Sequence, residues 1–377
     1  VRVVDLFCGC GGMSLGARQA GFEVVAGLDT DPIAIQTYQR NFGAERGRLA
    51  DLASLEPRAF ARSVGLRRGE LDLLIGGPPC QGFSKNVPRA QRTHEDPRNL
   101  LVQRFLTFVE FLRPRAIIME NVAEMKNGFG GAFSSEIAER LGAAGYAVEA
   151  RVLRASEHGV PQQRRRAFFI GRRDSTRPFP ALPAQAPVTV RDAIGDLPPL
   201  AHGEGSDETE YADPPATPYQ IGMRAGSPLL RDHVARPLRP TQAARLASIG
   251  PGQGLRDLPD ALRPRSGYSG AYGRLTWEAP APTITRWVFH PGSGRYGHPR
   301  DPRVITIREA ARLQSFPDSF TFCGSYIQKA HQVGNAVPPL LMRALAVEMA
   351  RLLAGDRGPG RTVSPLPPGQ AAPAGRG

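Results

Sequence analysis

Short apolar runs alternate with amphipathic stretches along the first 171 residues of the chain. Residues 1–7, 23–28, 71–75, 115–119, 146–153 and 167–171 have the length and the glycine or polar boundaries of buried strands. Helical periodicity is found between them, at residues 13–20, 32–42, 97–112 and 133–144. Strands that alternate with helices in this way predict an open α/β sheet.

The alternation stops at about residue 172, where proline, glycine and irregular sequence take over. Regular patterns return at residues 275–285, in a helix at 307–313 capped by Thr306, and in a final helix that opens within 332–339 and runs to about 353. We therefore expect a domain at 1–171 that is completed by 275–353, a separate module at 172–274, and a disordered tail at 354–377.

Residues able to bind a nucleoside follow the first two predicted strands. A glycine turn at residues 8–12 leads into a helix, whose free N–H groups suit a carboxylate or phosphate. Asp29 ends the second strand, where an acid can accept hydrogen bonds from a ribose. A helix N-cap is the alternative interpretation of Asp29 or Asp31, and a glycine turn alone is a weak signal.

A cysteine follows the third of these strands on a rigid segment. Pro78 and Pro79 restrict the backbone before Cys80, and Gly82 lets the chain turn away afterwards. A lone cysteine is more often a small buried apolar residue, so its neighbours decide. Glu120 follows the next strand and is a candidate proton donor if burial raises its pKa; a surface loop acid is the alternative.

The charge of the chain favours a nucleic-acid partner. The formal net charge is +13, and three of the 48 basic residues are lysines. Arginine makes bidentate contacts with phosphate and guanine, although a GC-rich genome would also enrich it. Seven arginines and one acid lie within residues 151–173. In an extended segment, every second arginine would lie on the same face of the strand. The alternative interpretation is a basic edge strand exposed to solvent.

Other functional classes lack support in the composition. No run reaches the roughly 18 apolar residues of a membrane span, and no signal segment opens the chain. The four cysteines suggest neither a disulfide framework nor a zinc site, so we expect reduced thiols, no metal and a cytosolic protein.

Five motifs in order resemble those of the DNA (cytosine-5) methyltransferases over about residues 3–353. They are Asp5-Leu6-Phe7-Cys8-Gly9-Cys10-Gly11-Gly12, Gly77-Pro78-Pro79-Cys80-Gln81-Gly82-Phe83-Ser84, Glu120-Asn121-Val122, Gln162-Gln163-Arg164-Arg165-Arg166 and Gly334-Asn335-Ala336-Val337-Pro338. The resemblance implies a Rossmann-like methyltransferase fold with a mixed seven-stranded sheet. It makes 1–171 and 275–353 the catalytic domain and 172–274 a small irregular target recognition domain.

The resemblance implies S-adenosyl-L-methionine as the cofactor. The matching positions that would hold it are Asp5, Phe7, Gly9, Gly11, Asp29, Thr30, Asp51, Pro78, Asn335 and Val337. The family commonly has a glutamate and a large apolar residue where this chain has Asp29-Thr30. Ile33 is therefore the alternative candidate for packing against the adenine.

The resemblance also assigns catalytic and DNA-contacting roles. Cys80 would add to C6 of a flipped-out cytosine, Glu120 would hold and protonate N3, and Arg166, with Arg164 beside it, would support the base. Candidate contacts to double-stranded DNA are the residues after Cys80 and arginines of the recognition module: Gln81, Ser84, Lys85, Arg89, Arg92, Arg231, Arg236 and Arg239.

We therefore expect a monomeric bacterial DNA methyltransferase, cytoplasmic and associated with the nucleoid. It would act in a restriction-modification system, with an endonuclease for the same site as partner, or as a solitary enzyme. Two alternatives are a tRNA cytosine-5 methyltransferase, whose Cys-Phe-Thr signature is absent here, and a catalytically silent DNA-binding regulator, against which Cys80, Glu120 and Arg166 argue.

Overall fold

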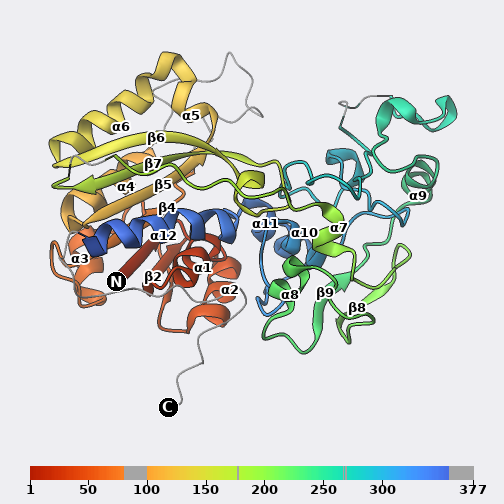
Figure 1. Ribbon diagram of the computed structural model, residues 1–377, viewed down its shortest axis with the longest axis horizontal. Helices are drawn as coiled ribbons and strands as arrows, with labels where there is room; N and C mark the ends of the chain where they lie inside the picture. The colour runs from red at the N-terminus through yellow and green to blue at the C-terminus, as the bar shows by residue number, and fades with distance from the viewer. Residues whose placement is uncertain (80–99, 176–177, 266, 268–269, 356–377) are drawn as a thin grey trace. The chain divides into compact units, whose positions relative to one another are not determined.

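The computed structural model describes residues 1–79, 100–175, 178–265, 267 and 270–355 (Figure 1). Contacts divide them into two units, which we describe separately. The first unit contains Val1–Ala155, Arg165–Ala184 and the C-terminal helix α12 (Pro339–Gly355); the second contains Ser156–Arg164 and Gln185–Pro338. Five predicted DNA contacts and the predicted nucleophile lie outside the described residues: Gln81, Ser84, Lys85, Arg89, Arg92 and Cys80.

The first unit is built on a mixed seven-stranded sheet, as predicted. In the order β3-β2-β1-β4-β5-β7-β6, the first five strands are parallel and β7 is antiparallel to both of its neighbours. The strands are β1 (Arg2–Leu6), β2 (Glu23–Asp29), β3 (Gly47–Leu49), β4 (Leu73–Gly76), β5 (Ala116–Val122), β6 (Tyr146–Arg154) and β7 (Arg165–Arg173).

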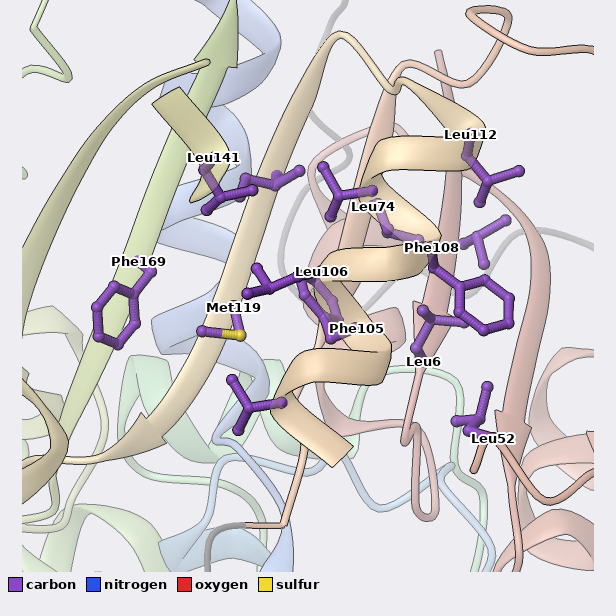
Figure 2. Close-up of a cluster of buried hydrophobic side chains, with 14 of the residues drawn as sticks. Leu6, Leu52, Leu74, Phe105, Leu106, Phe108, Leu112, Met119, Leu141 and Phe169 are labelled. Atoms are coloured by element: carbon purple, nitrogen blue, oxygen red, sulfur yellow. The ribbon is translucent and has the colours of Figure 1, made fainter. Parts of the chain in front are cut away.

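Helices of the first unit bury apolar faces against this sheet. Figure 2 shows Phe105 and Phe108 of α4 beside Leu6 of β1 and Met119 of β5, all fully buried. Removing such side chains from water is the main favourable term in folding. The helices before α12 are α1 (Gly12–Gln19), α2 (Pro32–Phe42), α3 (Pro57–Ser63), α4 (Leu100–Leu112), α5 (Glu124–Asn127) and α6 (Ala132–Ala143).

Helix α1 packs closely against α12. A Cβ atom at Gly16 would collide with the carbonyl oxygen of Pro339 and the side chain of Met342, so this position requires glycine. In Figure 1, α12 crosses the sheet on the viewer's side. The chain therefore completes the first unit with a helix that follows the entire second unit in sequence.

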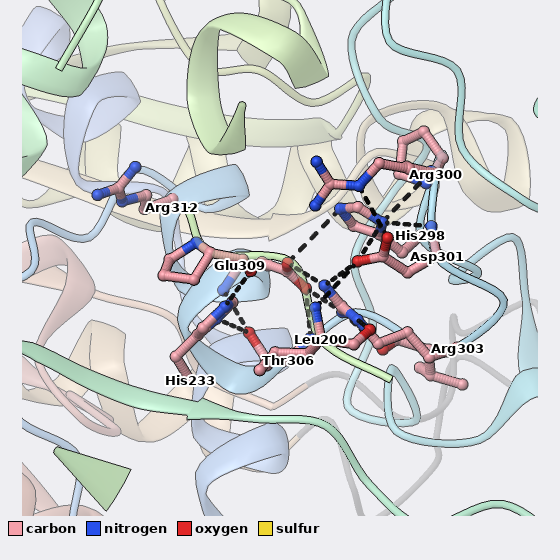
Figure 3. A network of polar contacts seen from close by, with 12 residues as sticks. Leu200, His233, His298, Arg300, Asp301, Arg303, Thr306, Glu309 and Arg312 are labelled. Atoms are coloured by element: carbon pink, nitrogen blue, oxygen red, sulfur yellow. Dashed lines mark hydrogen bonds and ion pairs between the residues drawn. The ribbon is translucent and has the colours of Figure 1, made fainter. Parts of the chain in front are cut away.

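The second unit contains little regular structure and an unusually charged interior. Its elements are α7 (Val190–Ile194), β8 (Gly205–Thr209), α8 (Pro218–Arg224), β9 (Leu230–Val234), α9 (Pro240–Ala247), α10 (Ile307–Leu313) and α11 (Tyr326–Asn335). Around α10, Arg303 Nη1 lies 2.8 Å from Glu309 Oε2, with both side chains buried (Figure 3). Burial alone would raise the pKa of Glu309, but Arg303 and His298 hold it well below its usual value.

Several predicted boundaries differ from the structure. Strand β5 continues to Val122, so Glu120 and Asn121 lie inside the strand. The final helix, predicted to open within 332–339 and to run to about 353, is confirmed as α12, whereas the preceding helix α11, which ends at Asn335, was not predicted. Pro338 and Pro339 lack the N–H groups that would continue α11. Residues 172–274, predicted to be irregular, contain α7, α8, α9 and the β8–β9 hairpin.

The observed units also differ from the predicted domain boundaries. The longer segment of the second unit runs from Gln185 to Pro338, whereas the recognition domain was predicted at 172–274 and residues 275–338 were assigned to the catalytic domain. The roles attached to those domains stay predictions. Within the described part of the chain, no helix is long and apolar enough to cross a membrane.

Candidate active site

Four strands bring predicted site residues to one edge of the sheet. Leu6 at the end of β1 pairs with Gly76 at the end of β4, which in turn pairs with Met119 of β5. Because β7 is antiparallel to β5, its first residues lie beside the last residues of β5, with Arg166 opposite Val122. Ligands of open α/β sheets bind at this carboxyl edge.

Glu120 and Arg166 meet at this edge. Arg166 Nε lies 2.8 Å from Glu120 Oε1, and the side chains are 20% and 12% exposed, respectively. Gly77 is close to the same carboxylate, because a Cβ atom there would lie 3.2 Å from Glu120 Oε2. The guanidinium thus orients a carboxylate beside the segment that leads to Cys80.

Asn121 anchors that segment from the neighbouring strand. Its Nδ2 donates a 2.9 Å hydrogen bond to the carbonyl oxygen of Pro78, and both groups are buried. Its Oδ1 accepts the backbone N–H of Val122 at 2.9 Å. Proline is rigid, so fixing the Pro78 carbonyl also fixes the direction in which the chain leaves β4. The sequence interpretation gave Asn121 no role, although it lies beside Glu120 in the third motif.

The glycine turn after β1 has the backbone expected for close approach of a ligand. Phe7, Gly9 and Gly11 have φ values of 62°, 52° and 102°, a region that favours glycine. The backbone N–H of Gly9 donates to Asp29 Oδ2 at 2.8 Å, which joins the turn to the end of β2. A Cβ atom at Gly9 would meet no other atom within 4 Å, so open space lies beside the turn.

Two acids next to this turn have no ionic partner among the described residues. Asp5 Oδ2 accepts a 2.7 Å hydrogen bond from the Ser14 hydroxyl, while Asp5 Oδ1 is buried without a hydrogen-bond partner. Burial raises the pKa of Asp5 to about 7, and burial likewise raises the pKa of Asp29. Neither acid forms an ion pair within the described part of the chain. Such a site suits a positively charged ligand.

The remaining predicted cofactor residues are spread over both units. Thr30 and Asp51 are exposed, and Pro78 is buried. Asn335, exposed, and Val337, buried, belong to the second unit.

One of these positions, Asp51, and the alternative adenine contact, Ile33, have defined local contacts. Asp51 Oδ1 accepts the backbone N–H of Ala53 at 2.9 Å. Ile33 is half-buried, and its backbone N–H donates to Asp31 Oδ1, which caps α2. The N-cap alternative therefore applies to Asp31, whereas Asp29 faces the glycine turn.

Arg164 differs from Arg166 in its environment. Its guanidinium is 2% exposed and donates through Nη1 to the carbonyl oxygens of Ile284, at 2.9 Å, and Gly334, at 3.2 Å. These contacts hold backbone of the second unit together. Arg164 therefore positions backbone of the second unit, and its expected support of the base stays a prediction.

The predicted DNA-contacting arginines of the second unit also differ. Arg231 Nε is 2.8 Å from Glu208 Oε2, across the β8–β9 hairpin, so its charge is already compensated. Arg236 and Arg239 form no ion pair with a described residue. No group of three or more potential metal-ligating side chains occurs in the part of the chain that the structure describes.

Comparisons with known proteins agree with this arrangement. The model of the C-5 cytosine-specific DNA methylase family matches residues 1–351. The Type II methyltransferase M.AgeI of Thalassovita gelatinovora is 33% identical, over 92% of this chain and 98% of its own length. M.DdeI of Desulfomicrobium norvegicum, also a Type II methyltransferase, is 36% identical over 92% of this chain and 88% of its own length.

A solved structure supports the same fold. A DNA modification methyltransferase encoded within an E. coli prophage has 27% sequence identity and a TM-score of 0.77, covering 94% of this chain and 99% of the other.

Proposed function

The chain belongs to the C-5 cytosine-specific DNA methylase family, and we propose that it methylates C5 of a flipped-out cytosine in double-stranded DNA through a covalent Cys80 adduct. Proteins of this family are DNA cytosine-5 methyltransferases that use S-adenosyl-L-methionine. The observation that carries the proposal is the Arg166–Glu120 pair, held beside Gly77 on the segment that leads to Cys80.

The proposed reaction begins with addition of the Cys80 thiolate to C6 of cytosine. The addition shifts the π electrons of the C5–C6 double bond toward C4 and N3, and Glu120 provides the proton that N3 then takes up. Arg166 holds the carboxyl group of Glu120 in place. C5 is then nucleophilic and would form the new bond to the methyl group as the bond from that methyl group to the sulfonium sulfur breaks, which leaves a neutral thioether. Loss of the C5 proton and elimination of Cys80 restore the aromatic ring.

The residues beside the glycine turn fit the cofactor. S-adenosyl-L-methionine, when bound, supplies an electrophilic methyl group and carries positive charge on its sulfonium and ammonium groups. Asp5 and Asp29 offer carboxylates that no described cation neutralises. Gly9 leaves space beside the turn for a close approach to the backbone.

We further propose that the protein acts as a monomer in the bacterial cytoplasm, at the nucleoid, within a restriction-modification system. The Type II names of the relatives support this setting. A cognate endonuclease would cut the same sequence unless this enzyme had methylated it. A solitary methyltransferase remains the alternative.

The test is incubation of the protein with labelled S-adenosyl-L-methionine and either genomic DNA or tRNA, followed by detection of 5-methylcytosine in each nucleic acid. Cys80→Ala should abolish both methyl transfer and covalent trapping by duplexes that contain 5-fluorocytosine. Cys323→Ala, a thiol of the second unit, is the matched control and should retain both. Label entering tRNA and not DNA would favour the tRNA enzyme, and DNA binding without transfer would favour the silent regulator.

A further inference from the structure

A basic pocket in the second unit contains two of the predicted DNA-contacting arginines, Arg236 and Arg239. It has a volume of about 170 Å³ and lies between the start of α9 and the segment at 289–291. None of its lining residues is acidic. They are Arg236, Pro237, Leu238, Arg239, Gln242, Phe289, His290 and Pro291.

The two arginines of this pocket carry charge that no described acid compensates. Arg236 lies over the Phe289 ring, with its guanidinium carbon 5.1 Å from the ring centroid, and Nη1 donates to the Phe289 carbonyl oxygen at 3.2 Å. This contact fixes the guanidinium and leaves four of its five N–H groups without a hydrogen-bond partner among the described residues. Arg239 is exposed and has no side-chain ion pair among the described residues.

His290 adds a neutral donor to the same pocket. Its Nδ1 accepts the backbone N–H of Gly292 at 3.1 Å, so in the neutral ring the proton is on Nε2. Burial lowers the pKa of His290, and the charges of Arg236 and Arg239 lower it further. The carboxamide oxygen of Gln242 is occupied, because it accepts the backbone N–H of Arg239 at 3.3 Å. The polar groups of the pocket are therefore mostly donors, which select an anion.

We propose that this pocket binds one phosphodiester group of the DNA backbone, an inference that rests on the proposed function. The planar guanidinium groups of arginine match the geometry of phosphate oxygens, and a phosphate group is small enough for a pocket of about 170 Å³. Contacts of this kind fix the register of a protein on the duplex without reading sequence. The pocket thus contributes to DNA affinity and leaves the choice of methylated sequence to other residues.

An exposed tryptophan provides a reporter next to the pocket. Trp287 is 43% exposed, and its ring centroid lies 5.8 Å from that of Phe289, which lines the pocket. Arg286 lies over the Trp287 ring, with its guanidinium carbon 4.8 Å from the ring centroid. The chain has one other tryptophan, Trp277, so Trp277→Phe leaves Trp287 as the single indole fluorophore. Its emission should change when a duplex occupies the pocket.

The test compares the salt dependence of DNA binding in Arg236→Gln/Arg239→Gln and in the wild type, using a random-sequence 30-bp duplex. Loss of one phosphate contact should reduce the slope of log K against log salt by about 0.9 and weaken binding roughly ten-fold. Arg67→Gln/Arg351→Gln removes the same charge from exposed positions of the first unit and is the matched control. Arg239→Gln alone is a second variant, at a position where the side chain is exposed.

The outcomes separate this inference from the proposed function. A smaller slope in both pocket variants, with the methylated sequence and the single-turnover rate on saturating DNA unchanged, supports the pocket. A slope equal to that of the wild type, or an altered methylated sequence, overturns it. Binding of inorganic phosphate to the pocket with unaltered DNA affinity also overturns it. If the wild type transfers no methyl group, the proposed function fails. The slope of log K for DNA binding against log salt can still be measured in that case, so the two failures are distinguishable.

Discussion

Oε1 of Glu120 and Nε of Arg166 lie 2.8 Å apart because β5 and β7 run antiparallel and place these residues at neighbouring strand ends. This pairing leads to the first prediction. Glu120→Gln should lower the single-turnover rate of methyl transfer by about 10²–10⁴-fold, since the amide cannot supply a proton to N3. Glu149→Gln alters a carboxylate of β6 in the same sheet and should leave the rate unchanged. Equal rates for both variants would remove Glu120 from the mechanism.

The second prediction concerns Asn121 and the carbonyl of Pro78. Asn121→Ala leaves that buried carbonyl without its donor, which should cost about 1–3 kcal/mol of unfolding free energy. Covalent trapping by 5-fluorocytosine duplexes should also slow by roughly ten-fold or more, because the segment before Cys80 loses its anchor. Asn127→Ala, on the exposed end of α5, is the control. Unchanged trapping in Asn121→Ala would restrict this residue to a stabilising role.

The third prediction follows from the buried carboxyl of Asp5. Its pKa of about 7 in the folded chain exceeds the value of 3.8 expected when unfolded, so the native state holds a proton that the unfolded state releases. The cofactor-free wild type should therefore lose roughly 4 kcal/mol relative to Asp5→Asn as the pH rises from about 4 to 7. Urea unfolding at several pH values measures this difference. Parallel pH profiles for the two proteins would contradict it.

The fourth prediction concerns His298 in the second unit, which changes stability in the opposite direction. Burial lowers the pKa of His298 from 6.5 to about 4, so acid favours the unfolded state, where the ring binds a proton more readily. The wild type should lose roughly 3 kcal/mol relative to His298→Asn as the pH falls from 6.5 to 4. Trp277 fluorescence reports the transition, because its ring contacts that of His298. His202→Asn, at an exposed position, should follow the wild type.

The sequence predicted the sheet and the positions of most site residues along it. Asp29 and the glycine turn were placed at neighbouring strand ends from apolar runs alone, and the structure joins them by the Gly9 hydrogen bond. Local patterns suffice there, because each strand and its following turn are adjacent in the chain.

Local sequence patterns could not predict the contacts between segments that are distant in the chain. Arg166 was separately predicted to support the base, but its pairing with Glu120 depends on the antiparallel register of β7. Likewise, Arg231 and Arg236 look equivalent in sequence. Only the β8–β9 hairpin brings Glu208 to Arg231 and leaves Arg236 uncompensated. The buried charges of α10 were also missed, since charged residues normally predict an exposed helix face.

The packing of α1 on α12 has a consequence for the order in which the protein can be made. A ribosome synthesises α1 first and α12 only after the whole second unit has emerged. Until then, Pro339 and Met342 of α12 cannot pack against Gly16 of α1, so the first unit cannot complete its core during most of translation. Folding of the catalytic sheet is thereby tied to synthesis of nearly the entire described chain, and a ribosome that stalls early releases an unfinished domain with apolar surface exposed to water.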